Sequence, residues 1–354
     1  MNDVIKPAVR ALRAYTLSPH RASVKLNQNE NPWDAPARIK EEVLRRFAAR
    51  KWSRYPDFVP ASLNDRLAQF AGWKTDGVIA GNGSNELIQA LLMVTIASGK
   101  TVLICEPTFA LYRQVTTVLG GEVITVPLTS ELKYDDEALL KTVETRQPDV
   151  TIICSPNNPT GCVMDEAVLK SLLNMSRGLV VIDEAYHEFA EQSVVPFLND
   201  HENLIVLRTF SKAMAFAALR IGYLLAAPDL VREIRKAVLP YNLNAFSQIA
   251  AEVAVENYET ELRPLVKQII SERDRVFQEL SRINGVTPVA SKGNFMVVKS
   301  AATDPARIFT DLLKRDVLVR DVSSYPMLSE YFRFNVGTPE ENERLLKGIR
   351  EICG

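Results

Sequence analysis

A lysine and an arginine lie eight residues apart in one short segment, and both are of types that do chemistry. Leu204 to Ala226 reads LIVLRTFSKAMAFAALRIGYLLA, in which an apolar run ends at Thr209, Ser211 and Lys212, and Arg220 precedes a second apolar run. A lysine at the end of a buried strand is costly unless it is paired, neutralised or chemically used. Taken alone, the segment also fits a solvated loop whose cations reach water. The chemical interpretation is a lysine that bonds to a carbonyl group beside a phosphate site.

Polar side chains also follow two other apolar runs. Asp183 ends the run Leu179 to Ile182, where a carboxylate needs a cation or a hydrogen-bond donor. Tyr186 adds a phenol three residues later. Asn158 lies in the sequence NNPTG after another buried run, where a simple Asx/Pro turn is an alternative explanation.

A glycine-rich turn, Gly81 to Asn85, opens a predicted helix. Backbone N–H groups at such a turn bind anions with help from the helix dipole, although a plain helix-capping turn explains the sequence equally well. The turn is not a dinucleotide fingerprint, because Glu86 stands where the third glycine would be. Phe109, after the next strand, is a candidate flat cover for an aromatic ring, or simply a core residue.

Together these side chains describe one ligand. An aspartate holds a pyridine nitrogen protonated, an asparagine and a tyrosine bind a ring oxygen, and a lysine bonds to an aldehyde. An arginine, hydroxyls and a helix N-terminus bind a phosphate. The sequence therefore predicts a site for pyridoxal 5′-phosphate (PLP).

These residues need a scaffold that brings the ends of several strands together. Short continuous apolar runs alternate with helical segments, which predicts an α/β fold with a mostly parallel sheet between helices. The predicted strands are 78–80, 102–105, 122–126, 150–154, 179–182, 204–207 and 221–226, and the predicted helices include 37–51, 61–72 and 163–175. Sites are expected where such strands end.

The chain divides into three predicted parts. Residues 1–30 form an N-terminal arm, 31–245 a large cofactor-binding domain, and 246–354 a smaller α+β domain. The smaller domain starts with a long helical region, 247–280, that a kink or break at Pro264 interrupts.

The composition excludes several classes of protein. The 354 residues are 47% hydrophobic and 24% charged, with a net charge of −1, so no electrostatic footprint for nucleic acid or an anionic membrane is present. No apolar run has the length of a membrane span, and the start lacks the apolar core of a signal peptide. The four cysteines form no CxxC pair and no zinc-type spacing, which fits reduced thiols in the cytoplasm.

The motifs GNGSNE, EPTF, NNPTG, DEAYHEF, TFSKAMAFAALRIGY and FRFNVGT occur in this order. With them the chain resembles the fold-type-I PLP-dependent aminotransferases over nearly its whole length. The segments LNQNENP, RYPD, PYNLNAFSQ and LVRDVSSYP resemble most closely those of histidinol-phosphate aminotransferases.

The resemblance implies a role for each residue of the cofactor site. Lys212 corresponds to the Schiff-base lysine, and Asp183 to the partner of the pyridine nitrogen. Asn158 and Tyr186 bind the ring oxygen, and Phe109 stacks on the ring. The residues implied to hold the phosphate are Gly83, Ser84, Asn85, Thr209, Ser211 and Arg220.

The resemblance also implies substrate contacts and a partner. Tyr55, in RYPD, is implied to reach the cofactor phosphate of a neighbouring subunit, so a homodimer with shared active sites is expected. Arg333, in FRFNVGT, is implied to bind the substrate carboxylate or phosphate; a structural salt bridge is the alternative. Arg320 resembles a second substrate arginine, and Tyr15 and Asn29 are candidate contacts from the arm.

The implied reaction is reversible transamination between an amino donor and a 2-oxo acid, with the Lys212 amine moving the proton. For the histidinol-phosphate subfamily, L-histidinol phosphate and 2-oxoglutarate give imidazole-acetol phosphate and L-glutamate. Three alternatives remain: an aromatic or broad-specificity aminotransferase, a PLP decarboxylase of a phosphorylated amino acid, and a cofactor-binding regulatory module. No basic patch or DNA-binding segment supports the last.

Overall fold

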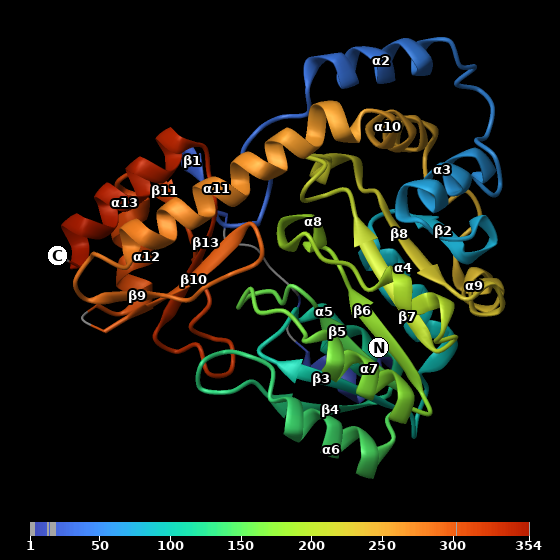
Figure 1. The fold of residues 1–354 in the computed structure, drawn as a ribbon, viewed down its shortest axis with the longest axis horizontal. Coiled ribbons are helices and arrows are strands. Elements are labelled where there is room, and N and C mark those ends of the chain that lie inside the picture. Colours follow the sequence, from blue (N-terminus) through green and yellow to red (C-terminus); the bar gives the residue numbers. More distant parts are fainter. Residues whose placement is uncertain (1–3, 13, 15–18, 302, 354) are drawn as a thin grey trace.

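The structure, a computed structural model, describes residues 4–12, 14, 19–301 and 303–353. Within this part of the chain, a seven-stranded sheet has the order β2-β8-β7-β6-β5-β3-β4 (Figure 1). Its strands are β2 (Val78–Gly81), β3 (Thr101–Glu106), β4 (Glu122–Pro127), β5 (Val150–Cys154), β6 (Leu179–Asp183), β7 (Leu204–Thr209) and β8 (Gly222–Ala226). β8 pairs antiparallel with β2 and β7, and the pairs from β7 to β4 are parallel. The predicted mostly parallel sheet is confirmed.

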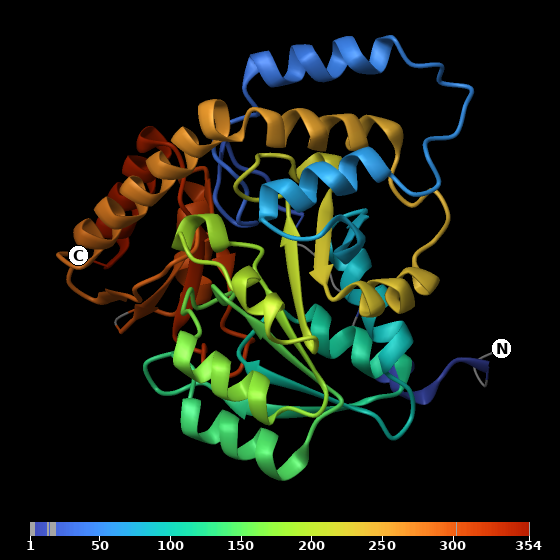
Figure 2. The ribbon, with the colours of Figure 1, turned by 45° about the vertical axis from the view of Figure 1, so that its right-hand side comes forward.

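Helices cover both faces of this sheet, because the side chains of its inner strands are apolar on both faces. Leu204 and Val206 of β7 pack into one core, and Ile205 and Leu207 into the other. The first core is covered by α2 (Ala37–Ala48), α3 (Ala61–Ala71), α6 (Asp136–Arg146), α7 (Glu166–Met175) and α10 (Ala245–Glu256). The second is covered by α4 (Ser84–Thr95), α5 (Leu111–Leu119) and α9 (Pro228–Ile234). The two layers of helices are visible in Figure 2.

A smaller antiparallel sheet has the order β12-β13-β10-β9. It consists of β9 (Val286–Pro288), β10 (Phe295–Ser300), β12 (Arg320–Asp321) and β13 (Tyr331–Asn335), with α11 (Arg263–Leu280), α12 (Pro305–Lys314) and α13 (Pro339–Cys353) packed beside it. β1 (Val24–Lys25) pairs in parallel with β11 (Val317–Leu318). Val24 and Leu26, near the end of the predicted arm, are therefore buried in the core of this smaller sheet.

The predicted long helical region is interrupted before Pro264. α10 ends at Glu256, a π-helical turn covers Tyr258–Leu262, and α11 follows. α10 packs on α2 and α3, whereas α11 lies beside α13. The division at residue 245 stays a prediction.

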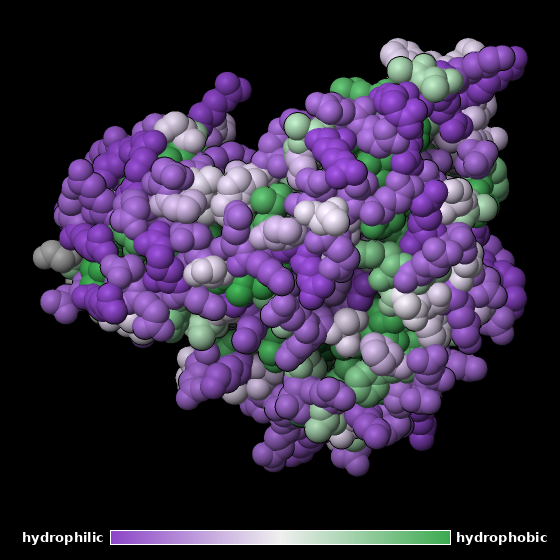
Figure 3. Space-filling model, turned by 45° about the horizontal axis from the view of Figure 1, so that its top comes forward, coloured by the Kyte–Doolittle hydropathy of each residue, from purple (hydrophilic) through white to green (hydrophobic). Residues whose placement is uncertain are grey.

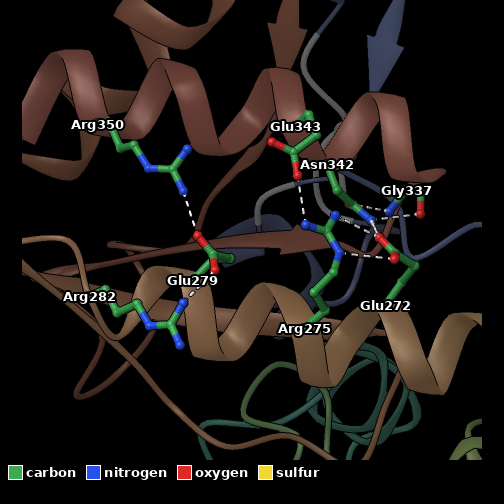
Figure 4. A network of polar contacts seen from close by, with 8 residues as sticks. All are labelled: Glu272, Arg275, Glu279, Arg282, Gly337, Asn342, Glu343 and Arg350. Carbon is green, nitrogen blue, oxygen red and sulfur yellow. Dashed lines mark hydrogen bonds and ion pairs between the residues drawn. The ribbon is translucent and has the colours of Figure 1, made fainter.

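Polar contacts join α11 to α13 (Figure 4). The buried Asn342 donates to Glu272 Oε2 at 3.0 Å and to the Gly337 carbonyl at 2.9 Å, and its Oδ1 accepts from the Gly337 N–H at 2.8 Å. Glu279 of α11 pairs with Arg350 of α13 at 2.7 Å. These contacts hold α13 against α11 and against the backbone that follows β13.

Some elements differ from the sequence expectations. α7 begins at Glu166, later than expected, because the Asp165 carboxylate accepts from the Ala167 N–H and caps the helix. The arm contains the short helix α1 (Pro7–Ala11), in line with a short helical patch expected there. The expectation did not include α6, α9, β1, β9, β12 or the other short helical segments. These segments are α8 (His187–Ala190) and the 3₁₀ turns Thr75–Gly77, Val195–Asn199, Ala217–Leu219 and Arg235–Ala237.

The outer surface is mostly hydrophilic on the face drawn in Figure 3, with hydrophobic residues in scattered patches. Among the helices in the described part of the chain, none combines the length and apolar character that crossing a membrane requires.

Candidate active site

A cavity of about 250 Å³ lies where the parallel strands end and the small sheet faces them. Predicted site residues that line it are Asn29, Ser84, Asn85, Phe109, Asn158, Asp183, Tyr186, Thr209, Ser211, Lys212, Arg220, Arg320 and Arg333. The fold thus brings together side chains that lie far apart in the sequence.

Two predicted site residues do not line the cavity, and a third lies outside the described part of the chain. Gly83 lies next to the cavity, because the neighbouring Ser84 lines it. Tyr55 is 77% exposed and stacks on Tyr241 with ring centroids 4.5 Å apart, so in this single chain it is on the surface. Tyr15 lies outside the described residues.

One end of the cavity can hold an anion. Arg220 Nη1 donates to Ser211 Oγ at 3.0 Å, and the Thr209 hydroxyl lies beside them. The first turn of α4 starts at Ser84, and no side chain caps it, so its N–H groups are available to an anion. Gly83 has a φ of +80°, and a Cβ there would lie 2.5 Å from Arg220 Nη2. Glycine at this position therefore lets the Arg220 guanidinium lie beside the first turn of α4. We call this anion-binding end of the cavity the cradle.

A buried carboxylate lies in another wall of the cavity. Asp183 Oδ1 accepts from the Ala185 N–H at 3.0 Å, and Oδ2 accepts from the Tyr112 hydroxyl at 2.6 Å. Burial raises the pKa of Asp183, and these two donors oppose that rise. A protonated ring nitrogen is a suitable further donor to such a carboxylate, because it brings both a hydrogen bond and a positive charge.

A phenol and an amide lie side by side in a third wall. The Tyr186 hydroxyl oxygen accepts from Asn158 Nδ2 at 3.3 Å and from Asn29 Nδ2 at 3.1 Å. Asn158 Oδ1 accepts from Arg333 Nη1 at 2.6 Å. Burial raises the pKa of Tyr186, so the phenol keeps its proton and can donate it to a ring oxygen.

The lysine faces the same space. Lys212 Nζ donates to the Gln28 carbonyl at 3.0 Å and lies 5.8 Å from the centre of the Tyr186 ring. Burial, and after it the positive charge of Arg333, lower the pKa of Lys212 from 10.5 to about 7. A sizeable share of the amine is then neutral near pH 7, which bonding to a carbonyl requires.

Two arginines come from neighbouring strands of the small sheet. Arg320 of β12 and Arg333 of β13 are register partners, and both line the cavity. Arg333 Nη2 also donates to the Asn27 carbonyl at 3.0 Å. Within the described part of the chain, the Arg320 side chain makes no hydrogen bond or ion pair, and the residue is half-buried. The pair suits a substrate with a carboxylate or phosphate group.

Sequence reasoning missed several lining residues. Tyr112 lies three residues after Phe109 at the start of α5, so helical spacing was a signal that could have found it. The other missed lining residues are Asn27, Gln28, Cys154, Ala185 and Tyr325. Asn27 and Gln28 belong to the segment LNQNENP, but nothing in that segment indicates which of its groups face a cavity.

The donor set fits PLP. The cradle at Gly83 and Arg220 fits its phosphate, Asp183 its ring nitrogen, and the Tyr186 phenol its ring oxygen. The Lys212 amine fits its aldehyde.

Known proteins resemble this chain over its full length. The family model of aminotransferase class I and II matches residues 21–349. A histidinol-phosphate aminotransferase of Chlorobium phaeobacteroides is 38% identical, covering 100% of this chain and 98% of the relative. One from Chlorobaculum parvum is also 38% identical, covering 98% of both chains.

Solved structures show the same fold. The histidinol-phosphate aminotransferase of Sinorhizobium meliloti, in complex with pyridoxal-5′-phosphate, has a TM-score of 0.86 at 22% identity and covers 99% of this chain and 97% of that one. The L-threonine-O-3-phosphate decarboxylase of Porphyromonas gingivalis has a TM-score of 0.81 at 20% identity, covering 93% of this chain and 99% of that one. The expected fold-type-I architecture is confirmed. With a family model that spans nearly all of its residues and relatives that match it from end to end, the chain belongs to the aminotransferase class I and II family.

Proposed function

We propose that this chain is a PLP-dependent aminotransferase that converts L-histidinol phosphate and 2-oxoglutarate to imidazole-acetol phosphate and L-glutamate. The observation that carries the proposal is the Lys212 amine, whose pKa is lowered to about 7 in a cavity that also holds the Asp183 carboxylate and an anion cradle. The curated relatives of that name, which match the whole chain at 35–38% identity, support the choice of substrate.

When bound here, PLP supplies a carbonyl for the substrate amine and an electron sink for the bonds at the substrate Cα. The residues of the chain then bind, orient and move protons. Lys212 Nζ, in its neutral form, is the base that takes the proton from the substrate Cα and would deliver it to the C4′ carbon of the cofactor. Asp183 holds a positive charge on the ring nitrogen, which stabilises negative charge that develops during proton transfer.

Substrate orientation falls to the two arginines of the small sheet. Arg333 is already fixed by Asn158 and the Asn27 carbonyl, so it presents a guanidinium whose position is set before substrate binds. The Arg320 guanidinium has no hydrogen-bond or ion-pair partner among the described residues, so it is available to the phosphate of the amino donor. With 2-oxoglutarate, the same pair binds carboxylates.

The proposal includes a homodimer with shared sites in a reducing, cytoplasmic compartment. Trp52, Tyr55, Phe58 and Leu239 are between 64% and 77% exposed, an unusual exposure for large apolar side chains that a partner subunit would cover. The test mixes two variants, Lys212→Ala and Tyr55→Ala, each with reduced activity. Mixed dimers with one complete site should regain activity, whereas simple addition of the two separate activities would contradict shared sites.

The substrate assignment is tested by adding single amino donors to the cofactor-loaded enzyme. L-Histidinol phosphate should discharge the cofactor absorbance, whereas L-phenylalanine should leave it nearly unchanged. Discharge by phenylalanine alone would instead indicate an aromatic aminotransferase. Release of carbon dioxide from L-threonine phosphate would indicate a decarboxylase. An Arg320→Gln variant should lose rate with histidinol phosphate more than with L-glutamate.

A further inference from the structure

Tyr112 is a buried side chain to which neither the motifs nor the proposed reaction assigns a task. It lies in the first turn of α5 with 0% of its surface exposed. Its hydroxyl donates to Asp183 Oδ2 at 2.6 Å, a short distance for a hydrogen bond from a neutral phenol to a carboxylate. Both residues line the candidate cavity.

The surroundings of Asp183 show why this hydrogen bond matters. The carboxylate is buried, and burial alone favours its neutral form. Glu184, the next residue, adds a negative charge, although Arg208 pairs with it at 2.9 Å. The Cys154 thiol lies nearby and brings no charge, because burial raises its pKa. On the side that favours the anion are the Ala185 N–H, the Lys212 amine and the Tyr112 hydroxyl.

Of the two side-chain groups among these, the Tyr112 hydroxyl is the one that always carries the proton that it donates to Asp183. Burial and the neighbouring Asp183 charge raise its pKa well above the ordinary value, so it keeps its proton. A phenol that is fully buried loses a hydrogen bond unless it donates to a nearby acceptor. Phe109 packs edge-to-face against it, with ring centroids 5.6 Å apart at 87°. The ring that covers the cofactor and the phenol that contacts Asp183 therefore belong to one short segment.

We propose that Tyr112 is a positioning residue, which holds the Asp183 carboxylate ionised and aimed at the ring nitrogen of the cofactor. This inference rests on the proposed function, since it assumes that PLP occupies the cavity. Tyr112 does not contact the substrate in this proposal. It acts through Asp183 alone, so its effect is limited to the part of the ligand that Asp183 contacts.

The test compares two ligands in binding to the apoprotein: PLP and an analogue in which carbon replaces the ring nitrogen. Wild-type protein should prefer PLP, because the analogue offers Asp183 no N–H donor. Tyr112→Phe should reduce this preference about tenfold or more, as expected for the loss of a hydrogen bond to a charged group. Equal loss of affinity for both ligands, with the preference unchanged, would overturn the proposal, because it would indicate a merely structural role.

A matched control is Tyr134→Phe. Tyr134 is also a buried tyrosine close to the cavity, but its hydroxyl donates to the Cys154 carbonyl at 2.5 Å and not to Asp183. This variant should keep the wild-type preference. In an Asp183→Asn background, Tyr112→Phe should change the preference no further, because the group through which it acts is gone. A further tenfold change there would overturn the proposal.

A second readout is the nitrogen NMR shift of PLP that carries ¹⁵N in its ring. Wild-type and Tyr134→Phe proteins should show a protonated ring nitrogen, and Tyr112→Phe a shift towards the unprotonated value at the same pH. An unchanged shift in Tyr112→Phe would overturn the role given to Tyr112. Failure of the wild-type protein to bind PLP at all would overturn the proposed function itself, and the two failures are thereby distinguished.

Discussion

Lys212 and Arg333 place two basic groups at one small cavity, and the repulsion between their charges favours the neutral form of the lysine. Arg333 is held by Asn158 and by a backbone carbonyl, so it keeps its charge and its place. The lysine then gives up its proton more readily, and a base becomes available near neutral pH. In the proposed reaction, the residue that binds substrate thus also lowers the pKa of the residue that moves the proton.

Arg333→Gln should raise the pKa of Lys212 above its value of about 7, because one of the causes of the lowered pKa is removed. The measurement is the pH dependence of the rate at which PLP attaches to the apoprotein. Arg320→Gln is the control, since Arg320 is not among the groups that shift this pKa. If the pH dependence of this rate in Arg333→Gln were the same as in the wild-type protein, the electrostatic argument would be contradicted.

Lys212→Met should abolish turnover and leave the protein folded. It should also change how stability depends on pH. In the folded apoprotein the lysine loses its proton near pH 7, whereas in the unfolded chain it does so near 10.5. Between these values the unfolded chain binds more protons, so this group makes the free energy of unfolding rise with pH.

Urea unfolding of both apoproteins at several pH values measures this contribution. From pH 7 to 10, the free energy of unfolding of the wild-type protein should rise relative to that of Lys212→Met. If the free energies of unfolding of the two proteins changed in parallel with pH, the lysine would be charged in the folded apoprotein. Retained turnover in the variant would contradict the role of Lys212 in proton transfer.

At the scale of elements, the sequence predicted the sheet well because its strands are buried on both faces and read as continuous apolar runs. It did not predict α6, in which only Leu139 and Val143 are buried, so the apolar pattern is weak. β12 is two residues long and half-buried, too short for any period to be read. The position of Arg320 opposite Arg333 depends on that pairing, which the sequence could not indicate.

The junction of α11 and α13 offers a test of element packing. Asn342→Ala should lower the free energy of unfolding by about 2–4 kcal/mol, because it leaves both backbone groups of Gly337 buried without their partner. Arg282→Ala is the control: its ion pair with Glu279 is exposed, and its loss should cost less than about 1 kcal/mol. Equal effects in thermal unfolding would contradict this account.

At the scale of the whole molecule, a loop of the large sheet contacts the loop between β9 and β10, close to the candidate active site. Gly161 follows Asn158 by three residues, has a φ of +79°, and accepts at its carbonyl from the Lys292 N–H at 2.9 Å. A Cβ at Gly161 would lie 2.0 Å from Ser291 Oγ. The two parts of the molecule therefore meet at a residue that has room for no side chain.

Gly161→Ala should force this loop away from Ser291 and disturb Asn158, which lies in the cavity, so kcat/KM should fall by an order of magnitude or more. Gly72→Ala separates strain from contact: Gly72 also has a positive φ, of +70°, but nothing lies within 4 Å of its added Cβ. That variant should lose about 1 kcal/mol of stability and keep its activity. Equal activity in the two variants would contradict a role for the contact.

The lining of the candidate site was largely predictable, because most of its residues follow a strand end and their chemical types match parts of one ligand. The rest depends on the folded chain. Tyr112 resembles an ordinary core tyrosine until its hydroxyl is seen beside Asp183. Tyr55 lies on the surface of a single chain, so its predicted role depends on a second subunit.

The antiparallel strand β8 has a consequence for the order in which the protein is made. β2 is the first strand of the large sheet in the chain, yet its neighbour in that sheet is β8, the last. The helix N-terminus that follows β2 cannot take its place beside Arg220 before residues 222–226 have left the ribosome. Until then the growing chain has no phosphate cradle, so PLP cannot assist the early folding of the large sheet and can only stabilise it once the sheet is complete.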